Sequence, residues 1–321
     1  MGKGLVHSEN YSVFMNEQVL PYLEARRQNE TLKTPDQISL YTSFFTADDC
    51  RGTVMLLHGF TENIEKFSEV IYGFLKEGFS VCTLDQRGHG MSYRDPKLKY
   101  HYLTHVDHFE DYLKDAELVY DRWMKEAKAP RILFSHSMGG AVAALILERG
   151  LVSFDKAVFN SPMIAASTGN FPAWTGIAIC RGAKVLGKSK EMIFLSGPYT
   201  GEEKFEDSCA SGRERFDWYN EIRKAHPEFQ NCSPTYNWTL ESLKVTRKIL
   251  AKGQPEKIRI PVILFQASDD QTVLAEPQKA FVERLSDGKL VRIENARHEI
   301  YRSGNEAVDT WWDQVMNFIE K

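Results

Sequence analysis

Short apolar stretches alternate, over most of this sequence, with longer segments in which apolar residues recur every three or four positions. The short stretches are rich in β-branched and aromatic residues and predict strands, whereas the longer segments predict helices. Predicted strands lie at 79–84, 131–135, 156–160, 261–267 and 289–293, and predicted helices lie at 65–76, 109–126, 138–148, 277–285 and 306–319. Strands and helices that alternate in this way form βαβ units, so the pattern predicts an α/β fold with a mainly parallel sheet flanked by helices.

The N-terminal part of the chain follows a different pattern. Apolar positions at roughly helical spacing predict an amphipathic helix within 8–28, which Pro21 is expected to interrupt. The stretches 38–45 and 53–57 are separated by a turn-like run, and together they predict a β-hairpin.

A long segment between two predicted strands has no clear strand of its own. Residues 162–237 mix aromatic, glycine and charged positions and interrupt the alternation. Long insertions in compact domains often form lids, and ligands of α/β folds bind at the carboxyl ends of the strands. We therefore predict a core formed by 1–161 and 238–321 and a lid formed by 162–237. The alternative is an insertion without a role in binding.

Composition places the chain among ordinary globular proteins. Of its 321 residues, 42% are hydrophobic and 26% are charged, which argues against disorder and fibrous repeats. The net charge of −4 and the pI near 6.2 are unlike the basic surfaces that bind nucleic acid, so we expect no nucleic-acid partner. No apolar run approaches the roughly 18 residues that a membrane span needs.

The sequence also bears on location and on metals. No signal-peptide pattern is present at the N-terminus, and Val6 stands where a myristoylation motif needs Ser or Thr. Five scattered cysteines without a CxxC pair predict neither a zinc site nor a disulfide framework, so we expect a cytoplasmic protein with reduced thiols. His101, His105 and His108 loosely resemble metal-ligand spacing, but no second cluster supports them, and we predict no metal site.

A pattern typical of a nucleophile lies at 132–141. An apolar strand runs into a tight turn and then into a helix of small residues. The turn reads S-x-S-x-G and resembles the G-x-S-x-G nucleophile elbow, with Ser135 at the first glycine and Ser137 at the nucleophile. The helix that begins at Met138 directs its N-terminal N–H groups at the same place. The alternative is an ordinary strand-to-helix turn that contains serines.

A serine nucleophile requires a base, and the base requires an acid that orients it. In folds with this elbow the chain order is serine, acid, histidine, and only His226 and His298 follow Ser137. His226 lies in the insertion, whereas His298 follows a late predicted strand, so we predict His298 as the base; the alternative is a solvated loop histidine. Asp269 and Asp270 follow the preceding predicted strand, and the residues alone leave both open as the acid.

An oxyanion hole also needs a backbone N–H from the loop after an early strand. The segment 54–61 contains an apolar strand that ends in His58 and Gly59, and glycine lets the backbone approach a substrate closely. We predict the backbone N–H groups of Phe60 and Met138 as the two donors.

These motifs together resemble the serine α/β-hydrolases and, within them, the branch of monoacylglycerol lipases and bacterial lysophospholipases. The matching segments follow the family's order along most of the chain: 58–60, 85–90, 109–112, 136–140, 234–238, 270–273 and 296–299. In this family the acid usually precedes a valine or isoleucine by three residues, which favours Asp270 before Val273. Ser135 departs from the family, which has glycine or alanine at that position.

The resemblance implies a helical lid after the sixth strand and a two-step acyl transfer that needs no cofactor. Ser137 would attack an ester carbonyl, His298 would move the proton, and Asp270 would orient the imidazole ring. The alternative from another class is a non-catalytic binding protein on the same scaffold. That alternative predicts a missing member of the triad, whereas all three residues are present.

Three classes of small-molecule substrate stay open. A lipase or lysophospholipase would use Phe171, Trp174 and Ile177 in an apolar acyl site, and the basic run 181–190 would let the lid touch a membrane surface transiently. The alternative for that run is a solvated lid helix. A short-chain carboxylesterase is the second class. An aminopeptidase of the same fold is the third, and it would need an acidic site for the substrate's amine. The acidic residues available in the insertion are Glu202, Glu203, Glu206 and Asp207.

Overall fold

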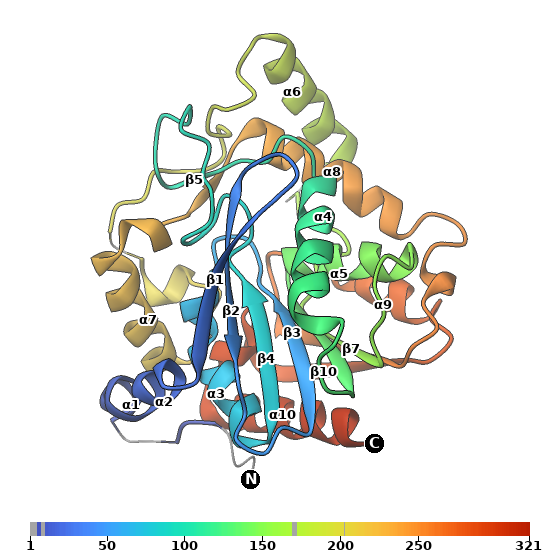
Figure 1. The fold of residues 1–321 in the computed structure, drawn as a ribbon. Helices are drawn as coiled ribbons and strands as arrows, with labels where there is room; N and C mark the ends of the chain where they lie inside the picture. The colour runs from blue at the N-terminus through green and yellow to red at the C-terminus, as the bar shows by residue number, and fades with distance from the viewer. Residues whose placement is uncertain (1–4, 8–9, 169–171, 202) are drawn as a thin grey trace.

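The computed structural model describes residues 5–7, 10–168, 172–201 and 203–321 and places an eight-stranded sheet at the centre of the protein (Figure 1). The strand order is β1-β2-β4-β3-β6-β7-β9-β10. The strands are β1 (Arg27–Lys33), β2 (Ser39–Phe45), β3 (Gly52–Leu57), β4 (Phe79–Leu84), β6 (Arg131–His136), β7 (Lys156–Asn160), β9 (Val262–Asp269) and β10 (Gly288–Arg297). From β4 to β10 every neighbouring pair is parallel, which confirms the predicted mainly parallel sheet.

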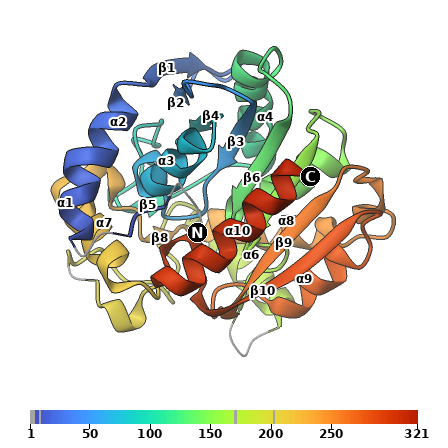
Figure 2. The same ribbon diagram turned by 90° about the horizontal axis from the view of Figure 1, so that it is seen from below.

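Helices cover both faces of this sheet, and Figure 2 shows α10 lying across one of them. The helices are α1 (Tyr11–Phe14), α2 (Leu20–Glu24), α3 (Ser68–Lys76), α4 (Glu110–Val119), α5 (Met138–Glu148), α6 (Ala173–Val185), α7 (Arg213–Ala225), α8 (Tyr236–Ile249), α9 (Ala275–Val282) and α10 (Asn305–Glu320). Residues of α1, α2, α3 and α10 form one hydrophobic cluster with the sheet, and residues of α4, α5, α8 and α9 form a second. The predicted α/β architecture is therefore confirmed.

Side-chain alternation along β3 explains how one strand serves both clusters. Val54 and Leu56 belong to the first cluster, and Met55 and Leu57 belong to the second. Because residues i and i+2 of a strand lie on the same face, a strand covered on both faces must be apolar throughout. This is why continuous apolar runs predicted the central strands.

The predicted hairpin between 38–45 and 53–57 is wrong. β4 lies between β2 and β3, so these two strands are not neighbours in the sheet. β2 pairs antiparallel with β1 instead, a strand that the sequence pattern did not predict. Of the seven residues of β1 only Leu32 is buried, because β1 is an edge strand with little contact to the core. Such a strand lacks the apolar alternation on which the prediction depends.

The N-terminal helical segment continues through Pro21, where an interruption was predicted. α1 passes into a π-helical segment, Met15–Val19, and then into α2, where Pro21 lies in the first turn. The π-helical turn that directly precedes α2 departs from the i→i−4 hydrogen-bond pattern that a proline ring disrupts.

The insertion between β7 and β9 contains α6 and α7 and leads into α8. In Figure 1, α6 lies at the top of the molecule, and α8 runs below it towards α5. Within the insertion, β8 (Ser233–Pro234) pairs in parallel with β5 (Leu103–Thr104) outside the main sheet. The division into core and lid at residues 162 and 237 stays a prediction. None of the helices in the described ranges is long and apolar enough to cross a membrane.

Candidate active site

Ser137 lies in a tight turn between β6 and α5. Its backbone has φ 49° and ψ −116°, a conformation that residues other than glycine rarely adopt and that needs support from the surroundings. A Cβ on Gly139 would lie 2.2 Å from the carbonyl oxygen of Leu57. A Cβ on Gly140 would lie 2.4 Å from the Cβ of Pro162. The glycines after Ser137 therefore let α5 pack directly on the neighbouring loops and hold the strained turn.

His298 and Asp270 continue a line of hydrogen bonds that starts at Ser137. The hydroxyl oxygen of Ser137 lies 2.8 Å from Nε2 of His298, and Nδ1 of the same ring lies 2.7 Å from Oδ2 of Asp270. Ser137 follows β6, Asp270 follows β9 and His298 follows β10. Three loops at the carboxyl ends of parallel strands thus bring together residues that are far apart in the sequence, in the order that the elbow pattern predicted.

Asp270 faces the histidine, whereas its neighbour Asp269 ends β9 and is exposed. Oδ1 of Asp270 accepts the N–H groups of Thr272 and Val273 at 2.9 and 3.1 Å. Burial acts to raise the pKa of the Asp270 carboxyl, but the charge and hydrogen bond of His298 and these two N–H donors hold the pKa below its ordinary value. The ionised carboxylate accepts a hydrogen bond from the protonated Nδ1 of His298. Nε2 of the same ring is then free to accept a hydrogen bond from the Ser137 hydroxyl.

The loop after β3 approaches the turn of Ser137 closely. A Cβ on Gly59 would lie 2.8 Å from the Cβ of Ser137, so glycine is required at this contact. Phe60 follows Gly59 in that loop, and Met138 is the first residue of α5. Within the described ranges, neither the Phe60 N–H nor the Met138 N–H has a hydrogen-bond acceptor. The two predicted oxyanion donors therefore lie on the backbone segments that border Ser137, and no acceptor within the described ranges takes their hydrogen bonds.

Other histidines of the region have different surroundings. His58 accepts the N–H of Gln86 at Nε2, 2.9 Å away, and its Nδ1 lies 2.8 Å from the carbonyl oxygen of Gly59. Burial lowers the pKa of His58 to about 4, so the neutral ring ties the loop after β3 to the loop after β4. His226 is exposed in the insertion and pairs with Glu228, as its position outside the core suggested.

A cavity of about 640 Å³ with mainly apolar walls lies between α6, α8 and the segments 166–168 and 193–195. Trp238 of α8 forms part of its wall, and the ring of Trp238 lies 4.3 Å from the ring of Phe60, centroid to centroid. Trp238 therefore contacts the side chain of Phe60, whose backbone N–H is a predicted oxyanion donor.

The structure does not bring the predicted substrate-binding residues into this wall. Ile177 is buried in a small cluster with Leu240 and Leu243 and does not line the cavity itself, although Leu243 does, and Trp174 is 65% exposed. Phe171 lies outside the described residues. The side of α6 that faces the cavity is instead the one that carries Thr175, Gly176 and Ile179.

Sequence reasoning missed the contribution of α8. Four residues of this helix line the cavity, and they are Trp238, Thr239, Ser242 and Leu243. They recur at i and i+4, so they occupy one face of the helix. This i, i+4 spacing at the end of the insertion is the sequence signal that could have identified them.

A smaller and more polar pocket of about 250 Å³ includes His298. The carboxylates of Glu206, Asp207 and Asp269 line it. Arg297 lines it as well, but its guanidinium donates to backbone carbonyl oxygens of the insertion. This pocket is the place where an acidic environment borders the predicted base.

The other predicted acidic residues lie apart from His298. Glu203 pairs with Arg223 at 2.6 Å in a different pocket, which Thr61 also lines. Glu202 lies outside the described residues. The part of the chain that the structure describes contains no group of three metal-ligating side chains.

Comparison with known proteins agrees with this arrangement. A model of the family described as serine aminopeptidase S33 matches residues 48–305. The probable lysophospholipase L2 of Haemophilus influenzae is 27% identical over 251 residues, which cover 78% of each protein. Lysophospholipase L2 of Escherichia coli K12 is 25% identical over 280 residues, which cover 83% of this chain and 79% of that protein.

A solved structure supports the fold. A soluble variant of monoglyceride lipase from Saccharomyces cerevisiae superposes with a TM-score of 0.71 at 16% identity, covering 92% of this chain and 95% of that one. The family model spans well over half of the chain, and the sheet has the predicted parallel order. The chain therefore belongs to the serine aminopeptidase S33 family and has the α/β-hydrolase fold that the sequence motifs resemble.

Proposed function

We propose that this protein hydrolyses carboxylic esters through an acyl-enzyme intermediate on Ser137. The observation that carries the proposal is the continuous line of hydrogen bonds from Ser137 through His298 to Asp270. The line has the geometry that activates a serine, because Nε2 of His298 is an acceptor within reach of the hydroxyl proton.

The reaction has two steps in which atoms balance. In the first, Nε2 of His298 takes the hydroxyl proton while Ser137 Oγ bonds to the ester carbonyl carbon, and the same proton then passes to the departing alcohol. In the second, His298 takes a proton from water, the resulting hydroxide attacks the acyl group, and the acid leaves while Ser137 regains its proton. Asp270 orients the ring and stabilises its charged form, and the N–H groups of Phe60 and Met138 hold the oxyanion.

We propose long-chain acyl esters of the lysophospholipid or monoacylglycerol kind as the substrates. The cavity of about 640 Å³ beside Phe60 is lined mainly by apolar side chains, which suits an acyl chain. An apolar cavity of about 150 Å³ already holds one benzene ring, so this one has room for a long chain. The names of the two lysophospholipase relatives support the same class.

Residues 162–237 would then act as a lid that also touches a lipid surface. Large apolar side chains stand exposed on α6 and on the segment after it, and they are Trp174, Ile179, Val185, Leu186, Phe194 and Leu195. A group of exposed apolar side chains of this kind marks a contact site for membranes or proteins. Lys188 and Lys190 are ion-paired with Glu191 and Asp95, so the apolar side chains support this proposal better than the basic run does. A cytoplasmic location remains part of the proposal.

An aminopeptidase activity is the second candidate, and one observation favours it. The polar pocket at His298 is lined by Glu206, Asp207 and Asp269, whose carboxylates would attract a protonated amine. The family description supports the same reading. Hydrolysis of aminoacyl anilides faster than of any ester would favour this candidate over the first.

Labelling with a fluorescent fluorophosphonate tests the proposal, because such probes react with activated serines. We expect labelling of the native protein and of Ser135→Ala, and none of Ser137→Ala. Ser135 is the matched control, since it lies two residues away at the end of β6, and the family that the sequence resembles has glycine or alanine at this position. A native protein that takes no label, or equal labelling of Ser137→Ala, contradicts the proposal. Rates with p-nitrophenyl esters, lysophospholipid and monoacylglycerol then separate the substrate classes.

A further inference from the structure

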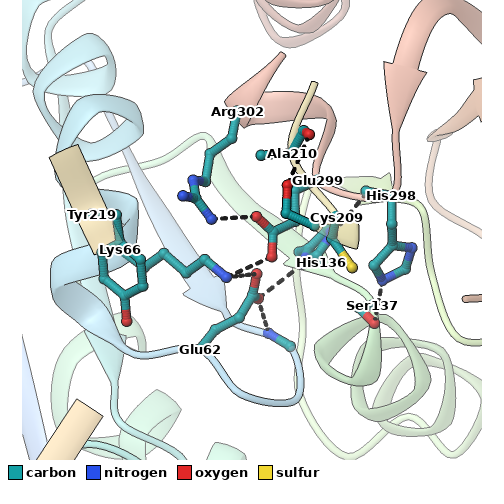
Figure 3. A network of polar contacts seen from close by, with 12 residues as sticks. Glu62, Lys66, His136, Ser137, Cys209, Ala210, Tyr219, His298, Glu299 and Arg302 are labelled. Atoms are coloured by element: carbon teal, nitrogen blue, oxygen red, sulfur yellow. Dashed lines mark hydrogen bonds and ion pairs between the residues drawn. The ribbon is translucent and has the colours of Figure 1, made fainter. Parts of the chain in front are cut away.

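Glu62 is a buried carboxylate directly behind the loop of the predicted oxyanion donor Phe60 (Figure 3). Its Oε2 accepts the N–H of Gly59 at 2.5 Å, and its Oε1 accepts the hydroxyl of Tyr301 at 2.6 Å. A buried carboxylate is tolerated only when such partners replace the water that it has lost. Glu62 therefore fixes the backbone of its own loop and ties that loop to the segment after His298.

His136 immediately precedes Ser137, and both nitrogens of its ring face acceptors. Nδ1 lies 2.8 Å from Oε2 of Glu62, and Nε2 lies 3.1 Å from the carbonyl oxygen of His298. An ionised carboxylate and a carbonyl oxygen only accept hydrogen bonds. Both ring nitrogens must therefore donate, which requires the doubly protonated, positively charged form of His136.

The electrostatics agree with that protonation state. Burial acts to lower the pKa of His136, but the charge and hydrogen bond of Glu62 raise it above its ordinary value. Burial acts to raise the pKa of Glu62, but His136 and Lys66 hold it far below its usual range. The charged or titratable groups that face His136 from the elements around it are His58, Glu62, Lys66, His298, Glu299 and Tyr301.

The same network holds the other side of the His298 loop. Nζ of Lys66 lies 2.5 Å from Oε1 of Glu299 and 3.7 Å from Oε1 of Glu62. Arg302 lies 2.5 Å from the second oxygen of Glu299, which is the residue after His298. Figure 3 shows these side chains as one chain of contacts that ends at the carbonyl of His298. His298 is thus held from two sides: His136 contacts its backbone carbonyl, and Lys66 and Arg302 hold the side chain of Glu299, the next residue.

We propose that Glu62 is a positioning residue that acts through the imidazolium of His136. Together they hold the oxyanion loop, the turn of Ser137 and the loop of His298 in a single geometry. The inference rests on the proposed function, since it assigns a task in the reaction of Ser137. Neither Glu62 nor His136 touches the reacting atoms. Loss of the Glu62 carboxylate should therefore change kcat more than it changes KM.

The test uses Glu62→Gln in the full chain, which keeps the shape of the side chain and removes its charge. We expect kcat for a p-nitrophenyl ester to fall by up to about 100-fold, the loss that a misplacement of catalytic groups by roughly an ångström can cause, while KM changes less than threefold. Glu62→Asp, which restores the charge on a shorter side chain, recovers part of kcat.

A spectroscopic measurement reads the protonation state directly. In protein with ¹⁵N-labelled histidine, the native His136 ring should still carry protons on both nitrogens at a pH above the ordinary histidine value of about 6.5. Glu62→Gln should abolish this signal at the same pH, because it removes the counter-charge. His136→Gln assigns the resonance by its disappearance.

Glu69 provides the matched control. It is similarly buried, and it pairs with Arg215 at 2.8 Å and with Tyr11 at 2.8 Å, away from the triad. Glu69→Gln should lower the melting temperature and leave kcat within threefold of native. A Glu62→Gln protein with native kcat, or a native His136 ring with one protonated nitrogen, overturns the inference while fluorophosphonate labelling of the native protein still supports the hydrolase. A native protein that neither labels nor hydrolyses esters overturns the proposed function and this inference with it.

Discussion

Replacing Thr239 with phenylalanine should shorten the acyl chain that the protein prefers. Thr239 lines the apolar cavity from α8, and it is half-buried there. Its hydroxyl donates to the carbonyl oxygen of Thr235 in the preceding turn, so it makes no contact on which the triad depends. A phenylalanine at this position points its ring into space that we assign to the acyl chain.

The size of the effect follows from the burial of methylene groups. Each CH₂ that leaves water contributes about 0.8 kcal/mol, which corresponds to about a fourfold change in kcat/KM. Phenylalanine has about four more heavy atoms than threonine and so displaces about four methylene groups, worth about 3 kcal/mol. We expect kcat/KM for a long-chain ester to fall by about 200-fold, and kcat/KM for a butyrate to stay unchanged.

The assay is a series of p-nitrophenyl esters from acetate to palmitate with native protein, Thr239→Phe and the control Thr239→Val. Valine has the shape of threonine and leaves the cavity open, so its chain-length profile should match that of the native protein. In the native protein kcat/KM should rise with chain length until the cavity is filled. A native maximum at acetate or butyrate, or an equal loss for short and long esters in Thr239→Phe, would refute the assignment of this cavity to the acyl chain.

Asp270→Asn should lower kcat by about 10⁴-fold. Because the folded-state pKa of the Asp270 carboxyl is depressed, the ionised carboxylate stabilises the fold above about pH 4, and this stabilisation is lost as the pH falls below that value. The melting temperature of the variant should therefore depend less on pH between about 5 and 3 than that of the native protein. Gly139→Ala should prevent folding or abolish fluorophosphonate labelling, because its Cβ would meet the carbonyl oxygen of Leu57, whereas Gly182→Ala, which meets nothing within 4 Å, should raise stability by about 0.5–1 kcal/mol in thermal denaturation. Leu186→Asp should weaken sedimentation with phosphatidylcholine vesicles and leave hydrolysis of a water-soluble ester unchanged; equal sedimentation would contradict a lipid contact at α6.

The central sheet and the order of the site residues could be predicted because their signals are local. Strands buried on both faces are apolar throughout, as in β3, where Val54 and Leu56 pack on one face of the sheet and Met55 and Leu57 pack on the other. The turn of Ser137 is equally local, because its strand, its glycines and its helix follow one another without a gap. The chain order typical of the elbow then predicted that Asp269 or Asp270 and His298 lie near Ser137 without knowledge of any side-chain contact, and the family resemblance favoured Asp270.

The parts that were wrong or missed depend on contacts between distant residues. Strand β1 carries little apolar surface, so its pairing with β2 left no pattern to read. The partners Glu62 and His136 are 74 positions apart, and Lys66 and Glu299 are 233 positions apart. Nothing in the spacing of such residues shows that they meet. Charged side chains are rarely buried unless paired, and these pairs form only in the folded protein.

The positions of the two pockets restrict how an ester lies in the site. In the proposed mechanism His298 gives its proton to the departing alcohol, so the alcohol would lie beside its ring, which the pocket lined by Glu206 and Asp207 includes. The acyl group would then extend past Phe60 to Trp238 and the apolar cavity. An ester bound in the opposite direction would bring its acyl chain against carboxylates and its polar part into an apolar space, and both placements cost free energy. The proposed arrangement therefore favours esters with a long acyl chain and a polar alcohol without net negative charge over esters whose alcohol is net anionic.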